Sequence, residues 1–206
     1  MRSFPFSIVA SLFTIAFLFV VNWLTTPTEL WAIYPALFLL LWPLNVLFKF
    51  SDGHKWYALI VSILLITVLL AINLVQTPDY YWILYAWLPL LYWPLVVFAG
   101  RRAAEVTFSV LASLVFILYY IALNIYFQTG FPWFIFPTFV ILWWPLSVTF
   151  ARRPMLFSVF GALLVTIFFW NVNALTSPDV IWAVYPIFAV LWWPLAIYFF
   201  VYRRTV

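Results

Sequence analysis

The scarcity of charged residues constrains this chain more than any other feature of its sequence. Only 7% of its 206 residues are charged, and no Asp, Glu, Lys, Arg or His occurs from Val106 to Ala151. A bilayer core about 30 Å thick is crossed by roughly 20 apolar residues in a helix, so this stretch is long enough for two spans and a turn. With 69% hydrophobic residues, the chain is predicted to be an all-α integral membrane protein.

Three series of residues recur at constant intervals along the chain. An Asn closes a long apolar stretch, a Trp follows it by 9 residues, and the Pro of a W-P-L string follows that Trp by 12. Each series advances by 51, 51 and 49 residues, and such spacing indicates tandem repeats, each predicted to be one helical hairpin. The series are Asn22, Asn73, Asn124 and Asn173; Trp31, Trp82, Trp133 and Trp182; and Pro43, Pro94, Pro145 and Pro194.

Four hairpins predict eight transmembrane helices in a single membrane domain that covers residues 1–206. The third turn, FQTGFPW, lacks the acidic residue of the other turns and shifts its proline, so the third hairpin is expected to deviate most, around Gly130. The repeats are expected at residues 1–55, 56–105, 106–155 and 156–206. The helices are expected near residues 5–25, 29–48, 56–76, 80–99, 106–127, 131–150, 156–175 and 179–201.

The basic residues predict one orientation for all four hairpins. Every Lys and Arg follows a predicted second helix or precedes a predicted first helix, and such loop residues remain cytoplasmic. Both termini are therefore predicted to be cytoplasmic, with the chain a multi-pass protein of the inner (cytoplasmic) membrane of the cell. Hairpins of one orientation are parallel repeats about an axis along the membrane normal, and a pseudo-fourfold bundle is their simplest packing. The nine residues are Arg2, Lys49, Lys55, Arg101, Arg102, Arg152, Arg153, Arg203 and Arg204.

The turns also carry a resemblance to a known family. The segments NWLTTPTELWAIYP, from Asn22, and NALTSPDVIWAVYP, from Asn173, fit the pattern N-x-L-x-x-P-x-x-x-W-x-x-x-P. This pattern, with an aromatic residue near the inner end of the second helix, resembles the bacterial 2TM domain, a membrane hairpin found alone or attached to signalling proteins. The chain lacks that family's flanking histidines and Gly-rich second helix. The resemblance implies four tandem hairpins and favours a sensory or accessory role.

The polar residues argue against catalysis. The only His, His54, falls in a predicted cytoplasmic loop, so the predicted spans offer no His ligand to a haem. All five acidic residues fall in loops or at helix ends, whereas coupled transporters place acidic groups near the membrane centre. The chain has no Cys. We therefore expect no catalytic residue, no cofactor, no metal site and no nucleic-acid partner. The expected partners are the lipid bilayer and a second membrane protein.

The repeated Asn residues form the first candidate site. In three units a Ser precedes the Asn by 11 residues, which places both on one helix face. Either the small residues permit close helix contact while the Asn holds the turn by hydrogen bonds, or four Asn side chains ring a polar vestibule near the outer face. The pairs are Ser11–Asn22, Ser62–Asn73 and Ser113–Asn124, while Asn173 has Ala162 in the Ser position and Thr166 one turn further on.

The second candidate site is the Trp–Pro pair near the inner end of each second helix. A proline inside a helix removes one backbone hydrogen bond and leaves a carbonyl oxygen to be satisfied elsewhere. Either the W-P-L string packs each hairpin against the next, or four kinks at equal depth shape a central cavity. The pairs are Trp42–Pro43, Trp93–Pro94, Trp144–Pro145 and Trp193–Pro194. The other Trp series, which follows the outer turns, is expected to anchor the chain at the membrane interface.

Two functions remain open from these observations. Short loops, abundant aromatic residues and the 2TM resemblance favour a non-enzymatic accessory, sensory or scaffold subunit that packs against a membrane partner or lipid. The alternative is a passive channel or facilitator built from the four repeats, favoured by polar groups at equal depth and the lack of a coupling carboxylate. We favour the first function, because nothing in the sequence identifies a permeant species.

Overall fold

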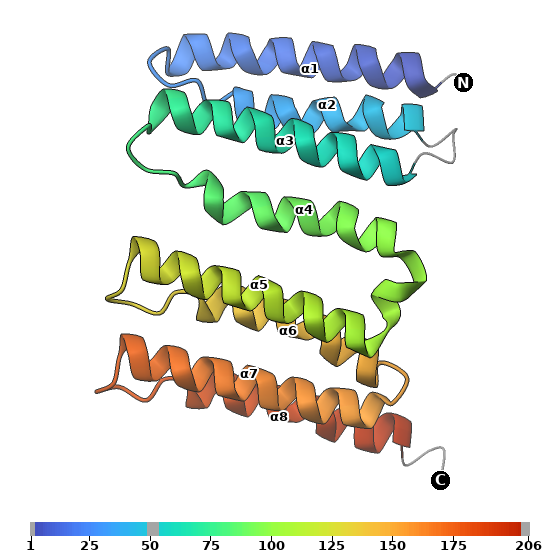
Figure 1. Cartoon of the computed structure of the whole chain (residues 1–206), viewed down its shortest axis with the longest axis vertical. Coiled ribbons are helices and arrows are strands. Elements are labelled where there is room, and N and C mark those ends of the chain that lie inside the picture. The colour runs from blue at the N-terminus through green and yellow to red at the C-terminus, as the bar shows by residue number, and fades with distance from the viewer. Residues whose placement is uncertain (1–2, 49–53, 203–206) are drawn as a thin grey trace. The chain divides into compact units, whose positions relative to one another are not determined.

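The computed structural model of the chain describes residues 3–48 and 54–202, and within these ranges all regular structure is helical. Eight α-helices follow one another, with a short 3₁₀ segment after the fourth and a π-helical segment after the eighth (Figure 1). The α-helices are α1 Ser3–Thr25, α2 Ile33–Phe48, α3 His54–Gln76, α4 Ile83–Ala99, α5 Val106–Phe127, α6 Ile135–Phe150, α7 Pro154–Thr176 and α8 Val184–Ile197. The short segments are η1 Gly100–Ala104 and η2 Tyr198–Tyr202.

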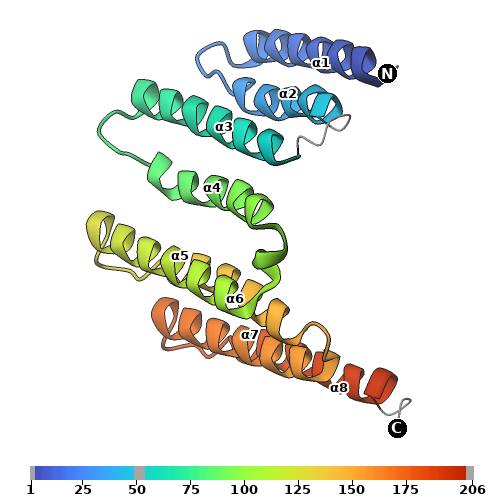
Figure 2. The same cartoon turned by 45° about the vertical axis from the view of Figure 1, so that its right-hand side comes forward.

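The helices form two compact units, Met1–Gly100 and Arg101–Val206, and each unit contains two hairpins. In the first unit α1 packs on α2, α3 on α4 and α2 on α3; in the second, α5 packs on α6, α7 on α8 and α6 on α7 (Figure 2). Within each unit the two hairpin turns lie at the same end of the helices (Figure 1). Gly100 ends α4 with a positive φ of 54°, a conformation that glycine adopts without a steric penalty.

Six of the described helical stretches are long and apolar enough to cross a membrane. Two further apolar helices are shorter, Ile33–Val46 in α2 and Ile135–Phe150 in α6. The structure thus agrees with a polytopic membrane protein made of helices. The eight spans expected from the sequence, the single domain of four repeats and the pseudo-fourfold bundle stay predictions.

The second helix of each hairpin begins later than the sequence suggested. These helices were expected from residues 29, 80, 131 and 179, but α2, α4, α6 and α8 begin at Ile33, Ile83, Ile135 and Val184. The reason is the turn before each helix, whose backbone groups bond to a side chain of the preceding helix as described below. The sequence predicts His54 in a loop, but the structure places it as the exposed first residue of α3.

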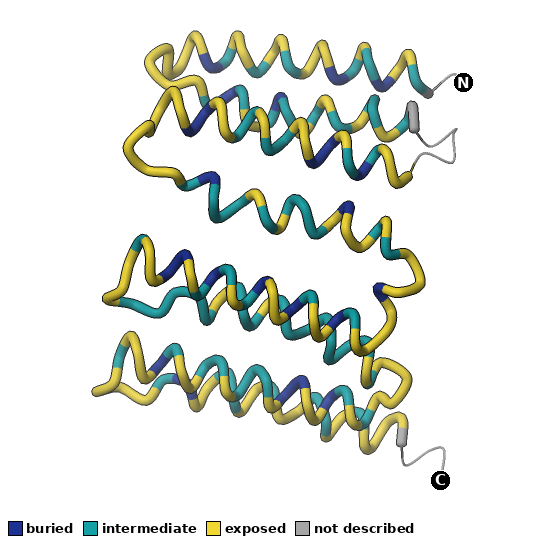
Figure 3. The backbone as a smooth tube through the Cα atoms, in the orientation of Figure 1, coloured by how far each residue is buried: buried dark blue, intermediate teal, exposed yellow. Residues whose placement is uncertain are grey.

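The buried residues are few and mostly small, as expected for helices whose outer surface meets lipid. Among the described residues the buried polar side chains all belong to the first helices of the hairpins, along which buried positions alternate with intermediate and exposed ones (Figure 3). They are Ser7, Ser11, Asn22, Ser62, Asn73, Ser109, Ser113, Asn124, Ser158 and Asn173. Small side chains let two helix backbones approach closely, which is the usual way that helices associate in lipid.

Candidate functional site

The repeated Asn of each first helix binds the turn that follows it. In the first hairpin the Asn22 side-chain amide donates to the carbonyl oxygens of Thr26, at 2.9 Å, and Glu29, at 2.6 Å. Its side-chain oxygen accepts a hydrogen bond from the backbone N–H of Ala32 at 2.9 Å. We call the Asn with these three bonds the turn clamp. It joins the end of the first helix to the start of the second.

The turn clamp recurs in all four hairpins with the same spacing along the chain. Asn73 donates to Thr77 and Tyr80 at 2.9 and 2.8 Å and accepts from Ile83 at 2.9 Å. Asn173 donates to Ser177 and Val180 at 2.8 and 2.9 Å and accepts from Ala183 at 2.7 Å. In the divergent third turn, Asn124 donates to the carbonyl oxygens of Gln128 and Phe131 and accepts from the N–H of Phe134.

These bonds use most of the hydrogen-bonding capacity of each Asn side chain. A primary amide has two N–H donors and one acceptor oxygen, and the turn clamp engages both donors and one lone pair of the oxygen. All four Asn side chains are buried. The clamp therefore accounts for the repeated Asn as a part of hairpin structure. That the four residues ring a polar vestibule stays a prediction.

The outer tryptophans bond to the same turns in the first unit. The indole N–H of Trp31 donates to the Thr26 hydroxyl at 2.8 Å, and that of Trp82 donates to the Thr77 hydroxyl at 2.9 Å. In the second unit the corresponding indoles pack edge-on against rings of the preceding helix, Trp133 on Tyr120 and Trp182 on Phe169. These tryptophans thus make hydrogen bonds or ring contacts within their own hairpins. Their role as anchors at the membrane interface stays a prediction.

The proline of the W-P-L string lies inside the second helix, and in two hairpins the carbonyl that it leaves open is bonded by the buried Ser across the hairpin. Pro43 has no N–H to donate to the carbonyl of Leu39, one turn earlier in α2. The hydroxyl of Ser11 donates to that same carbonyl oxygen at 2.9 Å. In the third hairpin Ser113 donates at 3.5 Å to Ile141, the residue one turn before Pro145. Ser11 thus satisfies the carbonyl that Pro43 leaves open, and Ser113 is placed for the same role at a longer distance.

The other two hairpins depart from this arrangement. Ser62 occupies the Ser position of the second hairpin, but its hydroxyl is buried and has no hydrogen-bond partner among the described residues. Its partner helix α4 contains a second proline, Pro89, before Pro94. In the fourth hairpin Ala162 has no hydroxyl to offer, so no side-chain bond from this position can satisfy the carbonyl that Pro194 leaves open.

The inner tryptophans make a repeated contact that the sequence analysis missed. Each packs edge-on against an aromatic ring in the first turns of its own hairpin, with ring centroids 5.5 to 6.1 Å apart. The pairs are Trp42–Phe6, Trp93–Tyr57, Trp144–Phe108 and Trp193–Phe157. The available signal was the constant distance of 36 residues between the two rings in every repeat. Trp144 also donates from its indole N–H to the carbonyl of Ala103 at 3.1 Å.

A second row of small buried residues was also missed. Four residues before each Ser position stands another small side chain, so each first helix begins with two small residues one turn apart. This spacing is a known motif for close helix packing in membranes. The pairs are Ser7–Ser11, Ala58–Ser62, Ser109–Ser113 and Ser158–Ala162, and all eight residues are buried. The signal was present in the sequence as a fixed spacing before each Asn.

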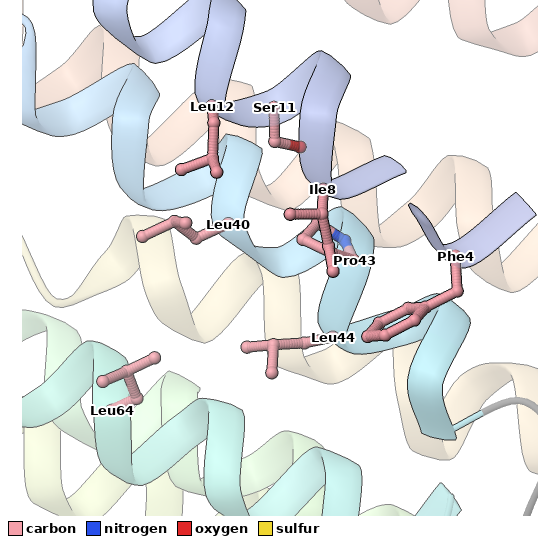
Figure 4. A pocket seen from close by; sticks show the side chains of 8 residues that line it. All are labelled: Phe4, Ile8, Ser11, Leu12, Leu40, Pro43, Leu44 and Leu64. Atoms are coloured by element: carbon pink, nitrogen blue, oxygen red, sulfur yellow. The ribbon is translucent and has the colours of Figure 1, made fainter. Parts of the chain in front are cut away.

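The hollow beside the first W-P-L string is apolar. A groove of about 330 Å³ runs between α1, α2 and α3, and Ser11 supplies its only polar side chain (Figure 4). It is lined by Phe4, Ile8, Ser11, Leu12, Leu40, Pro43, Leu44 and Leu64. A smaller hollow of about 210 Å³ lies at the fourth turn beside Asn173 and Trp170. The proline-containing helix α2 thus borders an apolar groove, and a central cavity shaped by four kinks stays a prediction.

Comparison with protein-family models, with curated proteins and with solved structures finds no match for this chain. The likeness to the 2TM domain therefore rests on the turn pattern alone. The expected absence of a catalytic residue, a cofactor and a metal site also stays a prediction.

Proposed function

We propose that this chain is a membrane scaffold or accessory subunit, built from four tandem hairpins of the 2TM type, that packs against a membrane partner or lipid and catalyses no reaction. The observation that carries this proposal is the turn clamp. The polar side chains that recur in every repeat bond to the backbone of their own hairpin, and thus build the fold. A conducting pathway needs polar groups that remain open to solvent.

We further propose that all eight helices cross the membrane with the turns outside and both termini in the cytoplasm. Helices α4 and α8 continue directly into η1 and η2. Helices α2 and α6 contain 16 residues each, or about 24 Å at 1.5 Å per residue. This length is close to a thin hydrocarbon core of about 27 Å. The turn clamp supports the proposal, because irregular backbone is tolerated near lipid where its polar groups are satisfied by the protein.

The proposal is tested by flux measurements with the full chain in proteoliposomes, using K⁺, Na⁺, Cl⁻ and glycerol as solutes. We expect no flux above that of protein-free vesicles. In parallel, Asn73→Leu should lower the thermal stability in detergent, because interhelical polar bonds in membranes contribute about 0.6 to 2 kcal/mol each. The matched control is Asn171→Leu, since Asn171 is exposed and bonds only to the carbonyl of Ile167 in its own helix.

The combination of the two readings decides between scaffold and channel. A flux above background that Asn73→Leu abolishes, in a variant as stable as the wild type, would overturn the proposal. Equal loss of stability in Asn73→Leu and Asn171→Leu would contradict the structural role of the turn clamp.

The second candidate function is the passive channel or facilitator. The observation in its favour is the hollow at the fourth turn, in which Asn173 is one of the lining residues. If this hollow is a vestibule, glycerol or ion flux should fall in Asn173→Leu while the thermal midpoint stays unchanged.

A further inference from the structure

Consecutive hairpins of the second unit join through two aromatic faces. Phe139 of α6 stacks on Phe168 of α7 with ring centroids 4.1 Å apart, and Phe150 stacks on Phe160 at 4.6 Å. We call the α6 set Phe136, Phe139, Trp143 and Phe150 the second-helix face, and the α7 set Phe157, Phe160 and Phe168 the first-helix face.

Phe157 has a central place in this joint. Its ring packs against Trp193 of its own hairpin at 5.5 Å and against Trp143 of the preceding hairpin at 6.2 Å. Trp143 of the preceding hairpin thus adds a third ring to the Phe157–Trp193 pair. Gly161 makes this approach possible, because a Cβ at that position would lie 2.4 Å from the Trp193 ring.

The first unit joins its hairpins through the same positions. Leu41 of α2 and Tyr57 of α3 occupy the places of Trp143 and Phe157 when the repeats are aligned on their Asn residues. The Tyr57 hydroxyl donates to the carbonyl oxygen of Leu41 at 3.3 Å. The joint between hairpins therefore recurs, although the chemistry of the contact differs.

The first and the last α-helix, α1 and α8, each carry one of the two faces that form this joint. In α8 and the adjoining η2 the second-helix face is again aromatic and consists of Tyr185, Phe188, Trp192 and, in η2, Phe199, all exposed, with Trp192 at 58%. In α1 the first-helix face consists of Phe6, Val9 and Phe17, which are also exposed, with Phe6 at 64%. Phe6 already packs on Trp42 of its own hairpin, as Phe157 packs on Trp193.

We propose that the second-helix face of α8 docks on the first-helix face of α1 in a second copy of this chain. Trp192 of one copy then lies against Phe6 of the next, as Trp143 lies against Phe157 within the chain. Two different faces meet in this contact, so the association is heterologous and joins copies head to tail. The proposal rests on the membrane-embedded hairpin array proposed above and is independent of whether that array conducts.

Exposure alone carries no argument here, since any helix of a membrane protein exposes apolar residues to lipid. The argument is that the counterparts of these two faces, on α6 and α7, pack together in the second unit. Between helices in lipid, packing and ring geometry supply the attraction, because lipid tails are as apolar as leucine. Aromatic rings at edge-to-face and stacked distances supply that packing.

Cysteine cross-linking tests the contact directly, because the natural chain has no Cys. Phe6→Cys and Trp192→Cys are placed in separate copies that carry different tags, co-expressed, and oxidised in native membranes. We expect a disulfide-linked band with both tags at twice the mass of the chain. The matched control replaces Trp192→Cys by Ala189→Cys, since Ala189 is the counterpart of Val140, which is 67% exposed on α6.

Two results would overturn the proposal. One is that the Phe6→Cys and Trp192→Cys pair gives a band with both tags no stronger than the band from the Phe6→Cys and Ala189→Cys pair. This comparison uses variants whose thermal midpoints match that of the wild type. The other is a disulfide at monomer mass when one copy carries both substitutions, without any band in the two-copy experiment. As a second readout, Trp192→Ala should shift the full chain in nanodiscs toward the monomer by light scattering. The flux assay is read separately, so a leak with intact docking would refute the scaffold role alone.

Discussion

At the residue scale, the choice of Asn in the turn clamp follows from its chemistry. The turn offers two carbonyl oxygens and one N–H to a single short side chain, and only a primary amide supplies two donors and an acceptor without a charge. Asp would place a negative charge against two carbonyl oxygens, and Ser has only one donor. A neutral group is also favoured because charges near lipid are costly. The repeated Asn is thus set by the local bonding of the turn.

Gly161 leaves room for the tryptophan rings packed around it in the second unit. We predict that Gly161→Ala destabilises the protein, because its Cβ would lie 2.4 Å from one Trp193 ring atom and 2.7 Å from another. Overpacking of this kind costs about 1 to 3 kcal/mol. The measurement is the thermal midpoint in detergent. The matched control is Gly130→Ala, where no atom lies within 4 Å of the added Cβ, and a larger loss there would contradict the assignment.

At the scale of the element, each proline-containing helix depends on its partner in the hairpin. The second helices run through their W-P-L prolines, as α2 runs through Pro43 and α6 through Pro145. In two hairpins a Ser of the first helix bonds the carbonyl that the proline leaves open. The first and second helices are therefore matched in sequence at a distance of 32 residues.

This match predicts coupling between Ser11 and Pro43. Ser11→Ala alone should lower stability by about 0.6 to 2 kcal/mol, the range for one interhelical polar bond in a membrane. In the Pro43→Ala background the loss should shrink, because the new N–H can bond the Leu39 carbonyl. A double-mutant cycle of thermal midpoints measures this coupling. Thr14→Ala is the control, since Thr14 bonds only to Ala10 of its own helix.

Equal losses for Ser11→Ala in both backgrounds would contradict the coupling. The fourth hairpin gives the converse comparison, because Ala162 stands in the Ser position. The substitution Ala162→Ser would add a hydroxyl donor near the backbone carbonyl of α8 to which Pro194 has no N–H to donate.

At the scale of the whole molecule, the number of membrane crossings depends on α2 and α6. Their first turns are replaced by the clamped segment after each Asn, which is why they are shorter than the first helices. If either helix failed to cross, every later segment would change sides. The basic residues would then no longer share one side of the membrane.

Reporter fusions test these two crossings. Fusions after residues 28 and 130 should report an outer location, and fusions after residues 53 and 152 a cytoplasmic one. Residue 53 lies outside the described residues, in the segment between α2 and α3. Reporters on the same side at 28 and 53, or at 130 and 152, would show that α2 or α6 does not cross. A fusion after residue 103 should be cytoplasmic and serves as the control for α4.

The sequence by itself determined the helical class, the existence and approximate extent of the eight helices, and the equivalence of their turns. These features depend on local composition and on fixed intervals along the chain, such as those between Asn22, Trp31 and Pro43. The late start of the second helices was missed, because it depends on which backbone groups the Asn side chain engages.

The Ser and Asn positions marked one contact face of the first helices in the sequence, but only the tertiary structure decided which groups meet on each face. It paired Ser11 with the carbonyl opened by Pro43, Trp42 with Phe6, and the α6 rings with those of α7. In a soluble protein an apolar stripe on a polar helix reveals the buried face. Here the helices are apolar on all sides, as is typical of membrane-spanning helices, so no apolar stripe in the sequence shows how each helix is rotated about its own axis.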